Sequence, residues 1–274
     1  MIGSIVWDVD PVLIHLGPLE IRWYGLMWGL GFILAYEMVS RLFKKEGYPD
    51  TWADKLFIYC IVSSILGARL GHCLFYEWDY YGAHPIEILK VWKGGLASHG
   101  GVFALILALV WYSKKVTHKS VWWLFDRMIP AVAVVCACIR FGNLMNSEIF
   151  GFPTTLPWGF EFIRSREWQE LYNQGGVAQA CHPTQIYEML YCITALVVSW
   201  FMYHKMHLQQ RIGLITGVSL LIFFGSRFAL EFMKNPQVAE EVGMTFNIGQ
   251  WLSVPLILLG FYLIFTSKKR KEAF

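Results

Sequence analysis

Charged residues are scarce in this sequence of 274 residues. They make up 16% of it, whereas soluble domains contain about 25%. The formal net charge is only +3, and the basic residues do not cluster into a stripe that could follow the phosphates of a nucleic acid. We therefore expect no nucleic-acid partner.

The sequence also lacks the short motifs of several enzyme classes. It contains no HExxH zinc motif, no carboxylate pair with metal-ligand spacing, no glycine-rich phosphate loop and no serine nucleophile elbow. Its six cysteines have neither disulfide nor zinc spacing, and we interpret them as small buried apolar residues. We expect no metal and no cofactor.

Apolar residues dominate instead. They make up 56% of the chain, and the mean hydropathy is +0.44. The N-terminus has no basic region and no small-residue cleavage site, so we expect the first apolar run to stay as a membrane span. A span needs about 20 mostly apolar residues. This criterion predicts a single all-α integral membrane domain, residues 1–274, with seven spans at about 22–43, 55–76, 96–113, 121–141, 184–204, 212–232 and 248–267.

Two of the connections between spans are too long to be simple turns. Residues 77–95 contain "HPIEILKVW", in which apolar and charged residues alternate as in an amphipathic arm on a bilayer surface. Residues 147–183 are polar and punctuated by glycine and proline, and we expect them to form a small external cap.

Lysine and arginine are distributed unequally between the two sets of loops, which predicts the orientation. The richer set should face the cytoplasm, so the N-terminus should lie outside and the C-terminus inside. The poorer, outer set contains Arg22, Lys90, Lys93, Arg164, Arg166 and Lys234.

Polar residues at the ends of the spans should then gather in the outer half of the membrane. A buried arginine is costly in lipid, so such residues usually face a cavity and mark function. A snorkelling or packing arginine is the alternative, above all at Arg69. The predicted pocket residues are Tyr24, Arg69, His99, Arg140, Asn143, Asn146, Glu148, Glu188, Arg227 and Glu231.

The stretch "RFGNLMNSEIFG", residues 140–151, is the most informative part of this layer. If it stays helical, Arg140 and Asn143 share a face, and the stretch forms the wall of a polar pocket. Arg227 and Glu231 are four residues apart, so they can pair on one helix face. Two guanidinium groups in one pocket suit a phosphate, which arginine binds through two hydrogen bonds at once.

The sequence resembles the bacterial phosphatidylglycerol–prolipoprotein diacylglyceryl transferases over nearly its whole length. The resemblance rests on the 140–151 stretch and on "IRWYGLMWGLGF", "GARLGHCLFY", "GGLASHGG", "HPTQIYE", "SRFALEF" and "IGQWLS". It implies transfer of the diacylglyceryl group of phosphatidylglycerol to the lipobox cysteine of preprolipoprotein signal peptides. A thioether forms and glycerol 1-phosphate leaves, at the periplasmic side of the bacterial inner membrane.

For this reaction we expect Arg140 and Arg227 to hold the phosphate, with His99 as the first choice of general base. Glu148 and Glu231 are the alternative bases. Asn143 and Asn146 should orient the lipid head group, and Tyr24, Arg69 and Glu188 should complete the phosphatidylglycerol site. The partners implied are this lipid, the preprolipoprotein and the bilayer.

Two other function classes are consistent with a charged pocket among membrane spans. A transporter of an anionic solute predicts internal repeats and a site near the bilayer midplane, whereas no repeat is visible and the polar layer lies to one side. A lipid-binding scaffold would keep the arginines but would need no base.

Overall fold

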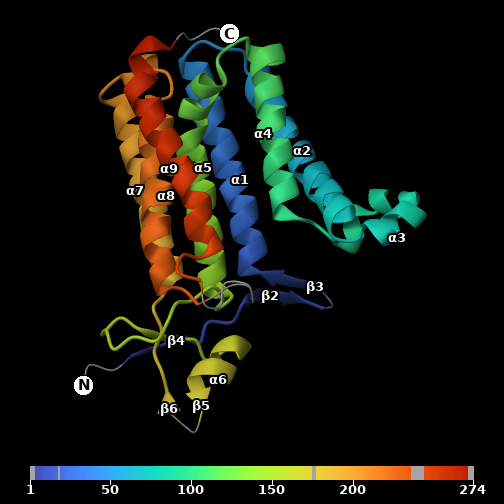
Figure 1. Ribbon diagram of the computed structural model, residues 1–274, viewed down its shortest axis with the longest axis vertical. Coiled ribbons are helices and arrows are strands. Elements are labelled where there is room, and N and C mark those ends of the chain that lie inside the picture. Colours follow the sequence, from blue (N-terminus) through green and yellow to red (C-terminus); the bar gives the residue numbers. More distant parts are fainter. Residues whose placement is uncertain (1–3, 18, 175–176, 236–243, 271–274) are drawn as a thin grey trace. The chain divides into compact units, whose positions relative to one another are not determined.

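The predicted helices dominate the structure (Figure 1), which is a computed structural model describing residues 4–17, 19–174, 177–235 and 244–270. Within these residues, seven helices are long and apolar enough to cross a membrane, as predicted. They are Trp23–Lys45 (α1), Thr51–Phe75 (α2), Ser98–Thr117 (α4 and the π-turn after it), Val121–Met145 (α5), Thr184–His204 (α7), Leu214–Met233 (α8 and a 3-10 turn) and Ile248–Lys269 (α9 and a 3-10 turn).

Contacts along the chain divide it into two compact units. Unit 1 combines Met1–Ala35 with Asp126–Arg270, and unit 2 contains Tyr36–Phe125. Unit 1 therefore holds α7, α8 and α9 with most of α5 and the first part of α1, whereas unit 2 holds α2 and α4. The predicted single membrane domain stays a prediction.

Small residues set the helix spacing in unit 1. A Cβ atom on Gly217 of α8 would lie 2.8 Å from the carbonyl oxygen of Gly260 on α9, so the two backbones approach closely. Small residues at such crossings allow tight helix packing in membranes. A buried carboxylate, Asp126, accepts hydrogen bonds from the backbone N–H of Gly213 at 2.6 Å and of Thr216 at 2.8 Å, and thereby caps the start of α8.

The predicted external cap has an apolar core of its own. It contains the strands Phe160–Glu161 (β4), Asn173–Gln174 (β5) and Val177–Ala178 (β6) and the helix Arg166–Tyr172 (α6). Figure 1 shows these elements at the end of unit 1 where α5 finishes and α7 begins. The buried core residues are Leu144, Phe150, Phe160, Phe162, Trp168 and Cys181.

The N-terminal segment adds three short strands that the sequence interpretation did not foresee. Ile5–Val6 (β1) pairs in parallel with β4, and Val12–Leu16 (β2) forms an antiparallel pair with Leu19–Arg22 (β3). Strands this short lack a long alternating pattern, so periodicity gives little signal for them.

Unit 2 is built around the contact between α2 and α4. A Cβ atom on Gly67 would lie 2.6 Å from the carbonyl oxygen of Gly100, so the glycines of "GGLASHGG" serve close helix packing. The predicted arm consists of the helix Trp78–Ala83 (α3) and the 3-10 turns Pro85–Leu89 (η1) and Val91–Lys93 (η2). Its apolar side chains Ile86, Leu89 and Trp92 are 73–76% exposed, as expected of a segment that contacts lipid.

Asp126→Ala should lower the stability of the protein, because it leaves two backbone donors and the Thr216 hydroxyl without their acceptor. We expect a loss of about 2 kcal/mol, seen as a lower thermal unfolding midpoint in detergent. Asp50 is the matched control, since it precedes α2 but makes no side-chain capping bond. An equal effect of Asp50→Ala would contradict the capping role of Asp126.

Candidate functional site

Five charged side chains of unit 1 form a continuous chain of ion pairs, which we call the charged cluster. Its members, in order of contact, are Arg140, Glu188, Lys234, Glu231 and Arg227. They come from the end of α5, the beginning of α7 and the end of α8 with the residue that follows it. Four of them were predicted as site residues, and Lys234 was not.

The two arginines occupy equivalent places at the ends of the charged cluster. Arg140 Nε lies 2.9 Å from Glu188 Oε2, and Arg227 Nε lies 3.3 Å from Glu231 Oε1. The glutamate side chains are 1% and 5% exposed, whereas the arginine side chains are 23% and 40% exposed. Each arginine is therefore fixed from the buried side and remains accessible on the other.

Lys234 joins the two halves of the charged cluster. Its Nζ donates to Glu188 Oε1 at 2.7 Å and to Glu231 Oε1 at 3.4 Å, and its side chain is 5% exposed. The sequence interpretation placed Lys234 among the outer loop cations. The signal that was missed is its spacing, because Lys234 follows Arg227 at i+7 and Glu231 at i+3, although its own backbone is extended after a 3-10 turn.

The residues that follow Arg140, which were predicted to form a polar wall, are joined by hydrogen bonds. Helix α5 ends at Met145, and Arg140 Nη1 donates to Asn143 Oδ1 at 3.2 Å. Asn143 Nδ2 donates to Glu148 Oε1 at 2.7 Å, and Asn146 Nδ2 donates to the same oxygen at 3.3 Å. These four residues form one hydrogen-bonded group that is attached to the charged cluster through Arg140.

The beginning of α7 holds this wall in place. Gln185 Nε2 donates to the carbonyl oxygen of Glu148 at 2.6 Å, and Thr184 Oγ1 donates to that of Ile149 at 2.6 Å. Both side chains are fully buried. The "HPTQIYE" motif therefore supplies two anchors for residues 148–149 and, at Glu188, a member of the charged cluster.

Gly151 allows the wall to approach the end of α8. It forms an antiparallel bridge with Lys234, and Phe152 N donates to the carbonyl oxygen of Met233 at 2.8 Å. A Cβ atom on Gly151 would collide with that carbonyl oxygen and would lie 2.8 Å from Thr184 Cγ2. Only glycine fits here without a backbone shift, so Gly151 helps to place Lys234.

The beginning of α9 supports Glu231. Asn247 and Gln250 form a reciprocal capping box at the start of this helix. Asn247 Nδ2 also donates to Glu231 Oε2 at 3.0 Å, so this N-terminal capping residue of α9 orients the carboxylate of Glu231. A Cβ atom on Gly249 would lie 2.7 Å from Glu231 Oε1, which explains the small residue in "NIGQ".

Tyr24, at the beginning of α1, packs against α5 beside the charged cluster. A Cβ atom on Gly142 would lie 2.9 Å from Tyr24 Cδ2, so the glycine two residues after Arg140 accommodates the tyrosine ring. Unit 1 thus brings together eight of the ten predicted residues: Tyr24, Arg140, Asn143, Asn146, Glu148, Glu188, Arg227 and Glu231.

The other two, Arg69 and His99, belong to unit 2. Arg69 is 2% exposed, and its guanidinium donates to the backbone carbonyls of residues 87, 88, 94 and 95 at 2.6–3.3 Å. This placement favours the packing alternative, in which Arg69 holds the arm. His99 is exposed, and its Nε2 lies 2.5 Å from the hydroxyl of Tyr76, which leaves Nδ1 for a substrate.

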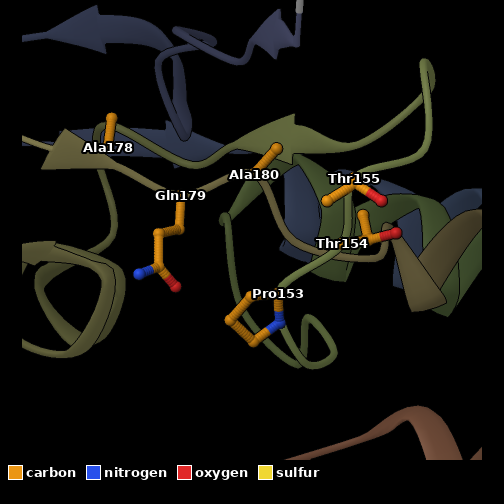
Figure 2. Close-up of a pocket in the computed structure, with 6 residues that line it drawn as sticks. All are labelled: Pro153, Thr154, Thr155, Ala178, Gln179 and Ala180. Atoms are coloured by element: carbon orange, nitrogen blue, oxygen red, sulfur yellow. The ribbon is translucent and has the colours of Figure 1, made fainter.

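A separate hollow of about 520 Å³ lies in the cap (Figure 2). Two segments line it, residues 153–155 and 178–180, and none of the six lining residues is charged or was predicted as a site residue. We therefore assign the candidate site to the charged cluster and not to this hollow. In the described part of the chain, no group of histidine, cysteine and carboxylate residues could hold a metal ion.

Comparison with known proteins shows the family of this chain. Residues 11–266 match the family model for prolipoprotein diacylglyceryl transferase. The chain belongs to the prolipoprotein diacylglyceryl transferase family. The resemblance noted in the sequence is thereby confirmed, and the match spans all seven apolar helices and stops before the 3-10 turn that follows α9.

Three relatives carry the name phosphatidylglycerol–prolipoprotein diacylglyceryl transferase. That of Porphyromonas gingivalis is 45% identical over 273 residues, which cover 97% of this chain and 95% of the relative. That of Chloroherpeton thalassium is 40% identical, and the aligned residues cover 98% of this chain and 96% of the relative. That of Tolumonas auensis is 39% identical, and the aligned residues cover 97% of this chain and 99% of the relative.

Gly151→Ala should disrupt the site, because the added methyl group displaces the Met233 carbonyl and with it Lys234. We expect a loss of stability of about 1–3 kcal/mol, measured as a lower thermal midpoint. Gly29 has open space around its Cβ position, so Gly29→Ala is the matched control. Unchanged stability of Gly151→Ala would show that the close approach is not needed.

Proposed function

We propose that this protein transfers the diacylglyceryl group of phosphatidylglycerol to the thiol of a prolipoprotein cysteine. The names of its relatives support the reaction. The charged cluster is the observation that supports assigning the reaction to particular residues of this chain. The products are a thioether-linked lipoprotein precursor and glycerol 1-phosphate. The acceptor cysteine stands in the lipobox of the signal peptide.

The two arginines are suited to the phosphate of the lipid. Each has its Nε within ion-pair distance of a buried carboxylate, and among the described residues no hydrogen bond or ion pair engages the terminal nitrogens of Arg227 or Nη2 of Arg140. The ion pairs, and for Arg140 the hydrogen bond to Asn143, hold these N–H groups near one place before a ligand arrives. Preorganised donors of this kind stabilise charge that develops in a transition state.

The reaction itself places that charge on the phosphate. The acceptor thiolate attacks the glyceryl carbon, an S–C bond forms and the C–O bond to the phosphate breaks. A phosphodiester with one negative charge becomes a phosphate monoester with two. Arg140 and Arg227 then stabilise the transition state, in which the second charge is developing, more than they stabilise the bound lipid, which is the condition for catalysis.

The acceptor thiol must lose a proton, since free cysteine titrates near pH 8.5. His99 is our choice of base, because Nδ1 stays accessible while Tyr76 holds Nε2. Glu148 is the alternative, although its Oε1 already accepts two amide bonds. Glu231 has both oxygens engaged by Lys234, Asn247 and Arg227, so we assign it to holding the site.

We place the protein in the bacterial inner membrane, with the N-terminus outside, the C-terminus in the cytoplasm and the active site toward the periplasm. The unequal distribution of lysine and arginine supports this orientation. The family and the relatives named above are transferases, and nothing in the fold favours transport of an anionic solute.

The proposed function is tested with purified protein, phosphatidylglycerol vesicles and a lipobox peptide. We expect release of glycerol phosphate and an equal amount of peptide whose cysteine has gained the mass of a diacylglyceryl group. A peptide with serine in place of the cysteine is the control. Release of glycerol phosphate without peptide modification would refute the transfer.

Arg140→Ala and Arg227→Ala should each lower turnover by about 100-fold, which corresponds to the loss of one preorganised donor. Arg166 is the matched control, because its side chain is 91% exposed and lies in the cap. Initial rates are compared at equal amounts of folded protein. Normal rates in both site variants would contradict the assignment of the phosphate to the charged cluster.

Replacing Cys181 by alanine should leave turnover unchanged, because the nucleophile comes from the substrate. Burial raises the pKa of the Cys181 thiol to about 12, so at any pH well below 12 the group is a neutral thiol. We therefore also expect Cys181 to resist alkylation of the folded protein at pH 7–8. Rapid modification, detected by mass spectrometry, would contradict this.

A further inference from the structure

We infer that Lys234 is a positioning residue for diacylglyceryl transfer, one that keeps the charged cluster positive; this rests on the proposed function. The structure gives Lys234 no access to a ligand, since its side chain is 5% exposed and its Nζ is directed at Glu188 and Glu231. Its effect must therefore pass through these carboxylates to the arginines.

The charges of the cluster define that effect. Without Lys234, two carboxylates would face two guanidinium groups, and the cluster would carry no net charge. With Lys234, the ion-paired side chains are three cations and two anions, which is one positive charge in excess. Glu148 is outside this count, because it is joined to Arg140 only through Asn143 and accepts hydrogen bonds from two neutral amides. That excess matches the single negative charge of a phosphodiester, and it favours the monoester leaving group still more, because this group carries two.

The geometry allows Lys234 to act on both arginines at once. It contacts Oε1 of each glutamate, whereas Arg140 contacts the other oxygen of Glu188. Lys234 thereby holds the two carboxylates on either side of one ammonium group. Without that cation the two buried carboxylates would repel each other and move apart, and each arginine would lose the fixed position of its partner.

The sharpest variant is Lys234→Gln, which can still donate hydrogen bonds to a carboxylate but carries no charge. We expect kcat to fall by about tenfold, within the range found for residues that couple to a site indirectly. KM for phosphatidylglycerol should rise less, because the lipid carries one negative charge and the leaving group two. Lys234→Arg should restore kcat to within about threefold of the unmodified protein, because it restores the charge.

Lys268→Gln is the matched control, since Lys268 is exposed and lies beyond α9. The double variant Lys234→Gln/Glu188→Gln distinguishes the net charge of the charged cluster from the contacts that Lys234 makes with the two glutamates. It restores the excess of one positive charge, but the lysine is absent. We expect its kcat to exceed that of Lys234→Gln. Equal loss in Lys234→Gln and Lys234→Arg, or no gain in the double variant, would overturn the charge role.

A second measurement decides the role of Lys234 independently of catalysis. Phosphatidylglycerol micelles should raise the thermal midpoint of the unmodified protein more than phosphatidylcholine micelles do, because ligands stabilise the folded state that binds them. Lys234→Gln should show a smaller difference and Lys234→Arg should keep the full one. An unmodified protein that transfers no lipid refutes the proposed function, whereas unchanged kcat and unchanged lipid stabilisation in Lys234→Gln refute the role of Lys234 alone.

Discussion

The need to hold two arginines in a fixed orientation at the edge of an apolar environment governs the architecture of unit 1. A guanidinium group in such a place is stable only when a counter-charge accompanies it. The structure meets this need from the buried side, where Glu188 and Glu231 each contact an Nε atom. In the function proposed above, Nη2 of Arg140 and the terminal nitrogens of Arg227 would bind the phosphate, so neutralisation and binding would use different parts of the same side chain.

The surrounding residues serve these ion pairs. Glycine occurs where a side chain would push the partners apart, as at Gly151 against Met233 and at Gly249 against Glu231. Helix caps occur where a carboxylate needs a second donor, as with Asn247 on Glu231. Residues far apart in the sequence thus converge because each lies at the end or the beginning of a helix in the same unit.

Features that depend on local spacing were predictable from the sequence. Length and composition are enough to define an apolar span, and the seven helices follow the predicted runs. Helical periodicity also predicted that Arg140 would meet Asn143 and that Arg227 would meet Glu231. Contacts between helices were not predictable, because nothing in the sequence specifies which face of α7 meets the end of α5. The ion pair between Arg140 and Glu188 is such a contact.

Arg69 and Lys234 show the same limit of sequence-based prediction. Arg69 was predicted as a site residue but holds the arm, whereas Lys234 was not predicted but belongs to the charged cluster. Arg69 stands in the predicted polar layer, yet its guanidinium binds the backbone of the arm. Lys234 resembles an ordinary loop cation, yet it is buried between two glutamates. In both cases the decisive fact is the direction of the side chain, which the fold sets and the order of residues alone does not.

The spacing of Arg227, Glu231 and Lys234 has a consequence for how the protein fits bilayers of different thickness. An inserted residue in this part of α8 would turn Lys234 by about 100° around the helix axis and away from Glu188. The polar end of α8 therefore has little freedom to slide or tilt. Mismatch with a thicker or thinner bilayer must be absorbed at the opposite end of the helix, near Gly213, or by deformation of the lipid itself.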